Sequence, residues 1–315
     1  MNVLTIVTRI SVCGIALLLS ACASSGASPL GVLTSSGASP LGALTIGAPK
    51  IGASTTPASI AELTIDANGS RMPGLIYQAA GQGPHPTAIM LHGYPGNEKN
   101  LDLAQALRKA DWNAVFFNYR GAWGAEGEFS FIGAEQDVQT AINYLQHADN
   151  SARLRVNPSQ ISLVGHSMGG HMAIAGILDN PSILCAVAHD GANMGARGKG
   201  LFNDKQSIKL WSDYSDTLFM LKGWSGKKAI AEISQHGSEL DLDGRVASIN
   251  QRPVHLIAAD TDVIPIDQHI KPLYEALRNY SDKISYQLID DDHSFSNSRD
   301  KLIDSTLRFL NKSCR

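Results

Sequence analysis

Short apolar runs alternate with helix-like patterns along most of the chain after residue 60. In the helix-like segments, apolar residues recur every three or four positions, as Leu103 and Leu107 do in residues 98–110. Alternation of this kind predicts a mainly parallel sheet with helices on both faces. The predicted strands are residues 87–91, 113–118, 160–164, 184–189, 253–259 and 284–289, and the predicted helices are residues 98–110, 134–147, 168–178, 267–279 and 297–311.

Two segments depart from this alternation. Residues 61–66 and 71–78 read as strands joined by Asn68-Gly69, a dipeptide that favours a tight hairpin. Residues 191–252 contain no obvious strand and are longer than a crossover requires. Their spaced aromatic residues predict several short helices that form a cap insertion over one end of the sheet.

The first 21 residues have the pattern of a signal peptide, with one positive charge at Arg9 followed by a short apolar core. That core is too short to span a bilayer. Leu19-Ser20-Ala21-Cys22 resembles a bacterial lipobox, and this resemblance implies that Cys22 is lipidated and becomes the mature N-terminus. An ordinary secretory signal is the alternative. Ala23, rather than Asp, at the next position favours the outer membrane of the bacterial cell envelope.

Residues 22–59 are rich in Gly, Ser, Ala, Thr and Pro, and they contain an eleven-residue segment twice, at 24–34 and 35–45. Such a composition predicts a flexible tether between the lipid and a domain at residues 60–315. Two copies are too few for a solenoid.

Composition limits the classes of function. Hydrophobic residues make up 43% of the chain and charged residues 17%, which excludes a fully disordered chain. With a formal net charge of -3, the chain has no basic excess to neutralise phosphates, so we expect no nucleic-acid partner. No sequence pattern implies a cofactor or a metal, and the sequence says nothing about oligomeric state.

The clearest chemical motif is Gly165-His166-Ser167-Met168-Gly169, a G-x-S-x-G pattern between a predicted strand and a predicted helix. In that context the serine sits on a sharp turn, and the glycines avoid collisions with neighbouring backbone. The helix that follows directs its positive end toward a developing oxyanion. A chance serine in a Gly-rich turn is the alternative.

Other motifs fit the same chemistry in the same order. They are His92-Gly93-Tyr94-Pro95-Gly96, Asn118-Tyr119-Arg120-Gly121, Asp262-Val263-Ile264-Pro265 and His293-Ser294-Phe295. With these motifs, residues 60–315 resemble the α/β-hydrolase family, in which serine, acid and histidine follow in that order. The resemblance implies Ser167 as nucleophile, Asp262 as orienting acid and His293 as general base. It also implies that the backbone N–H groups of Tyr94 and Met168 form the oxyanion hole.

Each of these roles has alternatives in the sequence. Asp260 and Asp190 are the rival acids, and we expect Asp260 to make loop hydrogen bonds instead. Residues 290–292 are three aspartates, which predict a solvated turn rather than a metal site. Among the other histidines, we expect His92 to hold the oxyanion loop and His166 to face away from the site. Three more, His171, His189 and His255, fall in predicted elements and are expected to be satisfied core residues.

This set of residues predicts a serine hydrolase that cleaves carboxylic esters, or related acyl compounds, through an acyl-enzyme on Ser167. A serine aminopeptidase or amidase of the same fold is the runner-up, and a non-catalytic, surface-anchored binding lipoprotein is the alternative from another class. The cap aromatics Trp211, Tyr214, Phe219 and Trp224 either line an acyl pocket or form the core of the cap, and we expect at least half of them to be core.

Export permits a disulfide between Cys185, in a predicted buried strand, and Cys314, beside the C-terminus. The sequence leaves the pairing open. We expect a buried strand thiol and a separate thiol in a frayed terminus.

Overall fold

The computed structural model describes residues 56–261 and 264–315, apart from the side chain of Leu201. The predicted signal peptide, Cys22 and all but the last residues of the predicted tether lie outside the described residues, as does Asp262. In the part of the chain that is described, no helix is long and apolar enough to span a bilayer.

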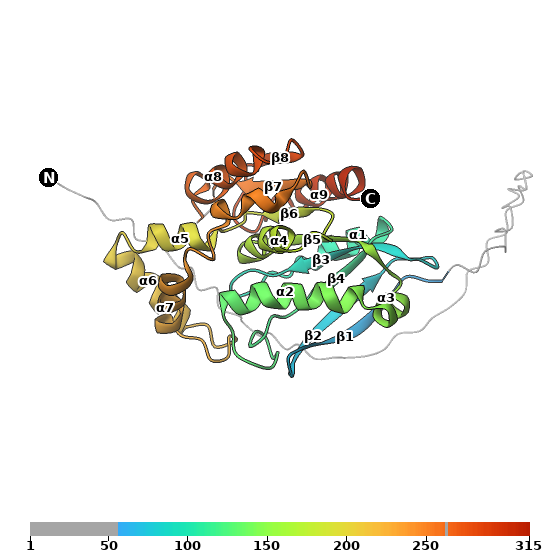
Figure 1. Ribbon diagram of the computed structural model, residues 1–315, viewed down its shortest axis with the longest axis horizontal. Helices are drawn as coiled ribbons and strands as arrows, with labels where there is room; N and C mark the ends of the chain where they lie inside the picture. The colour runs from blue at the N-terminus through green and yellow to red at the C-terminus, as the bar shows by residue number, and fades with distance from the viewer. Residues whose placement is uncertain (1–55, 262–263) are drawn as a thin grey trace, which may run out of the picture. The chain divides into compact units, whose positions relative to one another are not determined.

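Eight strands form one sheet in the order β1-β2-β4-β3-β5-β6-β7-β8 (Figure 1). The first two strands pair antiparallel to each other and β2 pairs antiparallel to β4, whereas all later neighbours are parallel. The mainly parallel sheet is therefore confirmed. The strands are β1 (Ser59–Ala67), β2 (Ser70–Gln78), β3 (His85–Leu91), β4 (Asn113–Phe117), β5 (Val156–His166), β6 (Ala186–His189), β7 (Val254–Ala259) and β8 (Ile284–Ile289).

Helices cover both faces of this sheet, as the alternating pattern predicts. One apolar cluster joins α2, α4 and α8 to the sheet, and a second joins α1 and α9 to its other face. Every residue of β4 and β7 is buried, as expected for strands covered on both sides. The bounds are α1 (Leu101–Lys109), α2 (Phe131–Gln146), α3 (Ala148–Leu154), α4 (Met168–Asp179), α8 (Ile266–Arg278) and α9 (Arg299–Ser313).

The predicted hairpin is confirmed with its two-residue turn. Ala67 pairs with Ser70, and Asn68 and Gly69 between them both have positive φ, at 55° and 87°. Two positive φ values suit a turn whose twist matches that of the strands. The short helix α3 and the early start of β5 were not predicted, because neither segment has a long apolar pattern.

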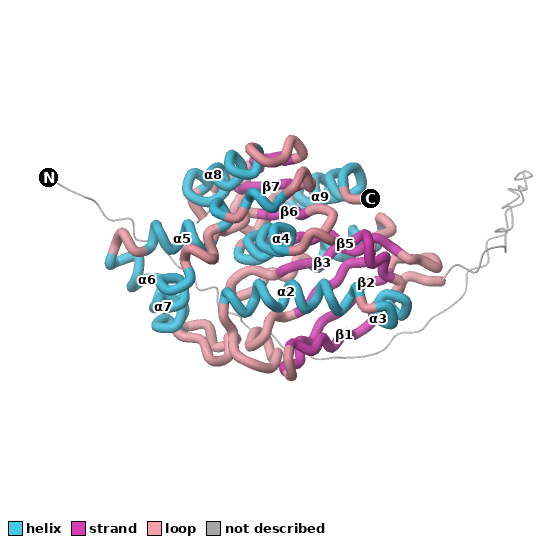
Figure 2. The backbone as a smooth tube through the Cα atoms, in the orientation of Figure 1, coloured by secondary structure: helices cyan, strands magenta, loops and turns pink. Residues whose placement is uncertain are grey.

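The stretch predicted as a cap contains helices and no strand among its described residues. It consists of α5 (Met194–Leu201), α6 (Lys205–Asp216), α7 (Gly226–His236) and two 3-10 turns, η1 (Leu242–Gly244) and η2 (Val246–Ile249). Figure 2 shows α5, α6 and α7 grouped beyond one end of the sheet, joined to it by long loops. Polar side chains cap the three α-helices: Asn193 accepts from one N–H group of α5, Asp204 from two of α6 and Ser225 from one of α7.

The expectation of separate thiols is wrong. Cys185, just before β6, forms a disulfide with Cys314, which follows α9, and their Cα atoms are 5.8 Å apart. The C-terminus does not fray, because Leu302 and Leu310 of α9 are fully buried against the sheet and bring Cys314 into the same apolar cluster.

Candidate active site

Ser167 occupies a strained turn between β5 and α4. Its φ and ψ are 59° and −123°, a region that non-glycine residues rarely adopt. The glycines of the motif are required sterically. A Cβ atom on Gly165 would lie 1.8 Å from the carbonyl oxygen of Gly169, and one on Gly169 would lie 1.9 Å from that of Leu91. The turn therefore has the form expected of a nucleophile elbow.

His293 enters the site from the loop between β8 and α9. The aspartates before it form the predicted turn, in which Asp292 accepts hydrogen bonds from the N–H groups of Ser294 and Ser296, each at 3.0 Å. In the part of the chain that the structure describes, no group of three potential ligands is placed to hold a metal. His293 and Ser167 line one pocket of about 290 Å³, so the two residues are brought together.

A buried carboxylate contacts this histidine. Asp190 follows β6 directly, is fully buried, and has a positive φ of 46°. Its Oδ2 lies 3.3 Å from His293 Nδ1, and its Oδ1 accepts a hydrogen bond from the N–H of Ala259 at 3.1 Å. Asp262, the acid that the sequence favours, lies outside the described residues. Asp260 makes loop hydrogen bonds with Thr261 and the N–H of Asp291, as expected.

The loop after β3 lies directly against the nucleophile. A Cβ atom on Gly93 would be 3.0 Å from Ser167 Cβ and 3.5 Å from its Oγ. Met168 is the first residue of α4, where an N–H group has no partner within the helix. Within the described residues, the N–H groups of Tyr94 and Met168 donate no hydrogen bond. Two free donors on either side of Ser167 are what an oxyanion hole requires.

His92 supports this loop, as predicted. Its Nδ1 donates to the carbonyl oxygen of Gly93 at 2.9 Å, and its ring packs 4.4 Å from that of Tyr119. Burial lowers the pKa of His92 to about 4. The imidazole is therefore neutral at physiological pH and adds no positive charge behind the loop.

His166 differs in part from the expectation. It does not line the pocket, but its ring packs 4.6 Å from that of His293, and its Nε2 lies 2.7 Å from the main-chain oxygen of His293. The residue before Ser167 thus helps to place His293. The sequence could not show this contact, because 127 residues separate the two histidines.

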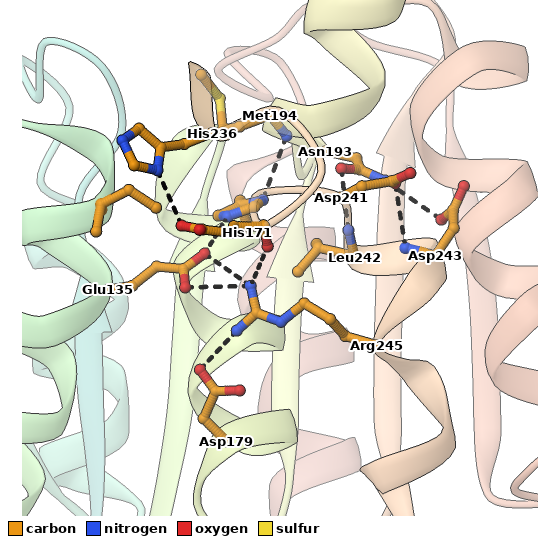
Figure 3. A network of polar contacts seen from close by, with 12 residues as sticks. Glu135, His171, Asp179, Asn193, Met194, His236, Asp241, Leu242, Asp243 and Arg245 are labelled. Carbon is orange, nitrogen blue, oxygen red and sulfur yellow. Dashed lines mark hydrogen bonds and ion pairs between the residues drawn. The ribbon is translucent and has the colours of Figure 1, made fainter. Parts of the chain in front are cut away.

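The predicted core histidines are satisfied. His189 bonds to Thr306 at 2.8 Å, and His255 bonds to Ser305 and Ser285 at 3.0 and 2.8 Å. His171, on α4, takes part in a network that the sequence analysis missed (Figure 3). There its Nδ1 accepts from the N–H of Met194 at 3.3 Å, so the Nε2 proton is donated to Glu135 at 2.8 Å.

The network of Figure 3 joins α4 to the base of the cap. Arg245, between the two 3-10 turns, bonds to Glu135 of α2 and to Asp179 at the end of α4. Burial alone would raise the pKa of Glu135, but the hydrogen bonds from His171 and Arg245 outweigh it and lower that pKa. The carboxylate is therefore charged and fixes both partners. The sequence does not predict this ion pair, because Arg245 and Glu135 are 110 positions apart and no local pattern connects them.

Of the four cap aromatics, two line the pocket, one packs among other aromatic rings and one is exposed. Trp211 and Tyr214 of α6 line the pocket beside Ser167. Trp224 packs edge-on against Phe129 and Phe131, at 5.0 and 5.1 Å between ring centroids. Phe219 does neither, since 90% of it is exposed.

Comparisons with known proteins agree with this arrangement. Residues 75–194 match a family model described as BD-FAE. An uncharacterized protein of Salmonella typhi, YfhR, is 28% identical over 242 residues, which is 73% of each chain. The esterase Pf2001 of Pyrococcus furiosus is 19% identical, with a TM-score of 0.60 over 82% of this chain and 94% of its own. An acylaminoacyl peptidase of Pyrococcus horikoshii is 14% identical, with a TM-score of 0.60 over 82% of this chain and 42% of its own. Sheet order, nucleophile turn and these matches together show that the chain has the α/β-hydrolase fold and is similar to esterases with that fold.

Proposed function

We propose that the protein is a serine hydrolase of carboxylic esters. The observation that carries the proposal is one pocket that holds Ser167 on its strained turn, His293, and the loop of Gly93 and Tyr94. The similarity to esterases agrees with it. A binding protein on this fold would have no need for a strained serine beside a histidine.

In the proposed reaction, His293 takes the proton of Ser167 Oγ as that oxygen attacks the carbonyl carbon of the ester. The carbonyl oxygen becomes an oxyanion and accepts hydrogen bonds from the N–H groups of Met168 and Tyr94. Collapse of the tetrahedral intermediate breaks the ester bond, and the leaving alcohol receives the proton from His293. Water then repeats the sequence on the acyl-enzyme, releasing the acid and restoring Ser167.

Asp262 remains the proposed orienting acid, because of its place after β7 and three residues before Pro265. Among the described residues, Asp190 places a carboxylate at the imidazole of His293. Buried negative charge at Nδ1 stabilises the imidazolium that forms during the reaction. We therefore propose that Asp190, which contacts Nδ1, also helps to hold the tautomer and to stabilise the imidazolium.

The walls of the pocket favour a small ester with an apolar acyl group. Apart from the proposed catalytic groups, its lining is mostly apolar and consists of Ala192, Met194, Arg197, Trp211, Tyr214 and Ile264. The guanidinium of Arg197 stacks on the ring of Trp211 at 4.7 Å. The volume of about 290 Å³ lies at the lower end for ligand sites. We therefore propose short acyl chains as the preferred substrates.

The test is a comparison of p-nitrophenyl esters of increasing chain length with aminoacyl p-nitroanilides, using Ser167→Ala as the matched control. The proposal expects ester hydrolysis that is fastest for short chains and is lost in Ser167→Ala. Activity confined to the aminoacyl anilides would establish the peptidase instead. Equal ester hydrolysis by the serine variant would remove the mechanism.

We further propose that Cys22 carries lipid and anchors the protein in the bacterial cell envelope, at the outer membrane. Support comes from the lipobox-like segment and from the Cys185–Cys314 disulfide, which is typical of proteins in oxidising compartments. In cells fed labelled palmitate, the wild-type protein should carry label and sediment with outer membranes. The variant Cys22→Ser should lose both properties, and an unlabelled wild type would contradict the proposal.

A further inference from the structure

The side chain of Tyr94 joins the oxyanion loop to the cap. Its ring stacks on Trp211 of α6 at 5.2 Å and packs edge-on to Trp224 at 6.3 Å. Its hydroxyl lies 2.6 Å from Trp224 Nε1 and 2.8 Å from the hydroxyl of Ser215. The residue that we propose as an oxyanion donor is therefore bound, through its side chain, to three residues of the cap.

The direction of each hydrogen bond in this contact is determined by the groups involved. An indole N–H can only donate, so Trp224 donates to the hydroxyl of Tyr94. The hydroxyl of Ser215 donates to the main-chain oxygen of Trp211 at 2.8 Å, and it therefore accepts from Tyr94. The result is a directed chain from Trp224 through Tyr94 and Ser215 to Trp211. Mainly through burial, the pKa of Tyr94 is raised to about 12, so its hydroxyl keeps the proton that this chain requires.

The loop is also held on its other side. Trp123, which lies outside the cap, donates from Nε1 to the main-chain oxygen of Pro95 at 2.8 Å. Gly93, before Tyr94, lies close against Ser167, because a Cβ atom there would be 3.0 Å from Ser167 Cβ. The backbone of Tyr94 thus lies between two fixed neighbours, and the tyrosine side chain is its link to the cap.

We infer that the Tyr94 side chain is a positioning residue, through which the cap holds the Tyr94 N–H in the oxyanion hole. This inference rests on the proposed function, because it concerns the same pocket. The ring and the N–H group are attached to the same Cα atom, so a ring held by the cap restricts where the donor can lie. A further consequence is that a substrate resting on Trp211 and Tyr214 affects the oxyanion donor through the cap.

The variants Tyr94→Phe and Ser215→Ala each remove the Tyr94–Ser215 hydrogen bond, and Tyr144→Phe is the matched control. The hydroxyl of Tyr144 accepts from Arg153 on the exposed side of α2 and α3, away from the site. Steady-state kinetics on a short ester are combined with binding of a boronic acid, whose tetrahedral adduct on Ser167 places an oxygen in the oxyanion hole. Thermal melting of each variant measures folding separately.

We expect kcat to fall about tenfold or more in both variants, since loss of a whole oxyanion donor costs about 10²- to 10³-fold. KM should change little, and boronate affinity should weaken by about the same factor as kcat. The loss in the double variant should be smaller than the product of the two single losses, because both variants remove the Tyr94–Ser215 bond, although Tyr94→Phe also removes the bond from Trp224 and Ser215→Ala the bond to Trp211. Tyr144→Phe should match the wild type.

Several outcomes would overturn the inference. An unchanged kcat in a folded Tyr94→Phe protein would overturn it, and so would a change in KM alone. A loss of kcat in the double variant equal to the product of the two single losses would also overturn it. A lower melting temperature with unchanged boronate affinity would reduce Tyr94 to a packing role. If the wild type neither hydrolyses esters nor binds boronate, the proposed function fails as well, and that result is distinct from failure of the Tyr94 variants alone.

Discussion

Removal of the Cys185–Cys314 disulfide should destabilise the fold without impairing the chemistry. The bond joins residues that are 129 positions apart, from the start of β6 to the end of α9. For a loop of that length, the chain-entropy model predicts a stabilisation of about 5 kcal/mol, at the upper end of what removal of native disulfides costs. A loss of about 2–5 kcal/mol corresponds to a fall in Tm of roughly 5–15 °C for a domain of this size.

Thermal unfolding with and without a reductant measures this effect, and thiol titration under denaturing conditions reports the bond directly. The matched control is the double variant Cys185→Ala/Cys314→Ala, whose Tm should already be low and should not respond to reductant. Ester hydrolysis at 25 °C should stay near the wild-type rate, because neither cysteine lines the pocket. A wild type that shows no disulfide by titration, or a Tm that ignores reduction of an intact bond, would refute the reasoning.

Three further predictions follow from the site and its supports. In steady-state assays at neutral pH, Asp190→Asn should lower kcat/KM about ten- to a hundredfold, and activity equal to that of the wild type would contradict this prediction. Asp262→Asn should lower kcat/KM more, toward the roughly 10⁴-fold loss that follows removal of an orienting acid. Burial lowers the pKa of His92 from 6.5 to about 4. Between pH 6.5 and pH 4, the imidazole of His92 is therefore protonated in the unfolded chain but not in the folded one. The free energy of unfolding should therefore fall by about 3 kcal/mol from this group as pH drops through that interval, and urea melts of His92→Phe should show a smaller fall. Gly165→Ala should abolish activity and lower Tm, since its Cβ would lie 1.8 Å from the Gly169 carbonyl oxygen; near-normal hydrolysis would disprove the steric argument.

Local patterns were enough to predict the framework of the site. The strand and helix periods place Ser167 directly after β5. The glycines around it are visible in the sequence, and they are the residues that the tight turn requires. His293 is likewise marked by its position between the last strand and the last helix. These residues are recognisable because the local sequence marks their positions.

The missed features depend on contacts between distant segments. The Asp190–His293 contact spans 103 residues, and the Tyr94–Ser215 bond spans 121. The disulfide forms only if α9 packs against the sheet, and no sequence pattern near Cys314 predicts that packing. The motif around Tyr94 predicts only that its backbone N–H is a donor. The partners of its hydroxyl, Ser215 and Trp224, belong to the cap, and the positions of the cap helices are known only from the folded chain.

The proposed nucleophile can be tested directly with a fluorophosphonate probe, which reacts with an activated serine, followed by mapping of the labelled peptide. The account predicts that wild-type protein is labelled at Ser167 and that Ser167→Ala is not labelled. No labelling of folded wild type, or equal labelling of the Ser167→Ala variant, would contradict it.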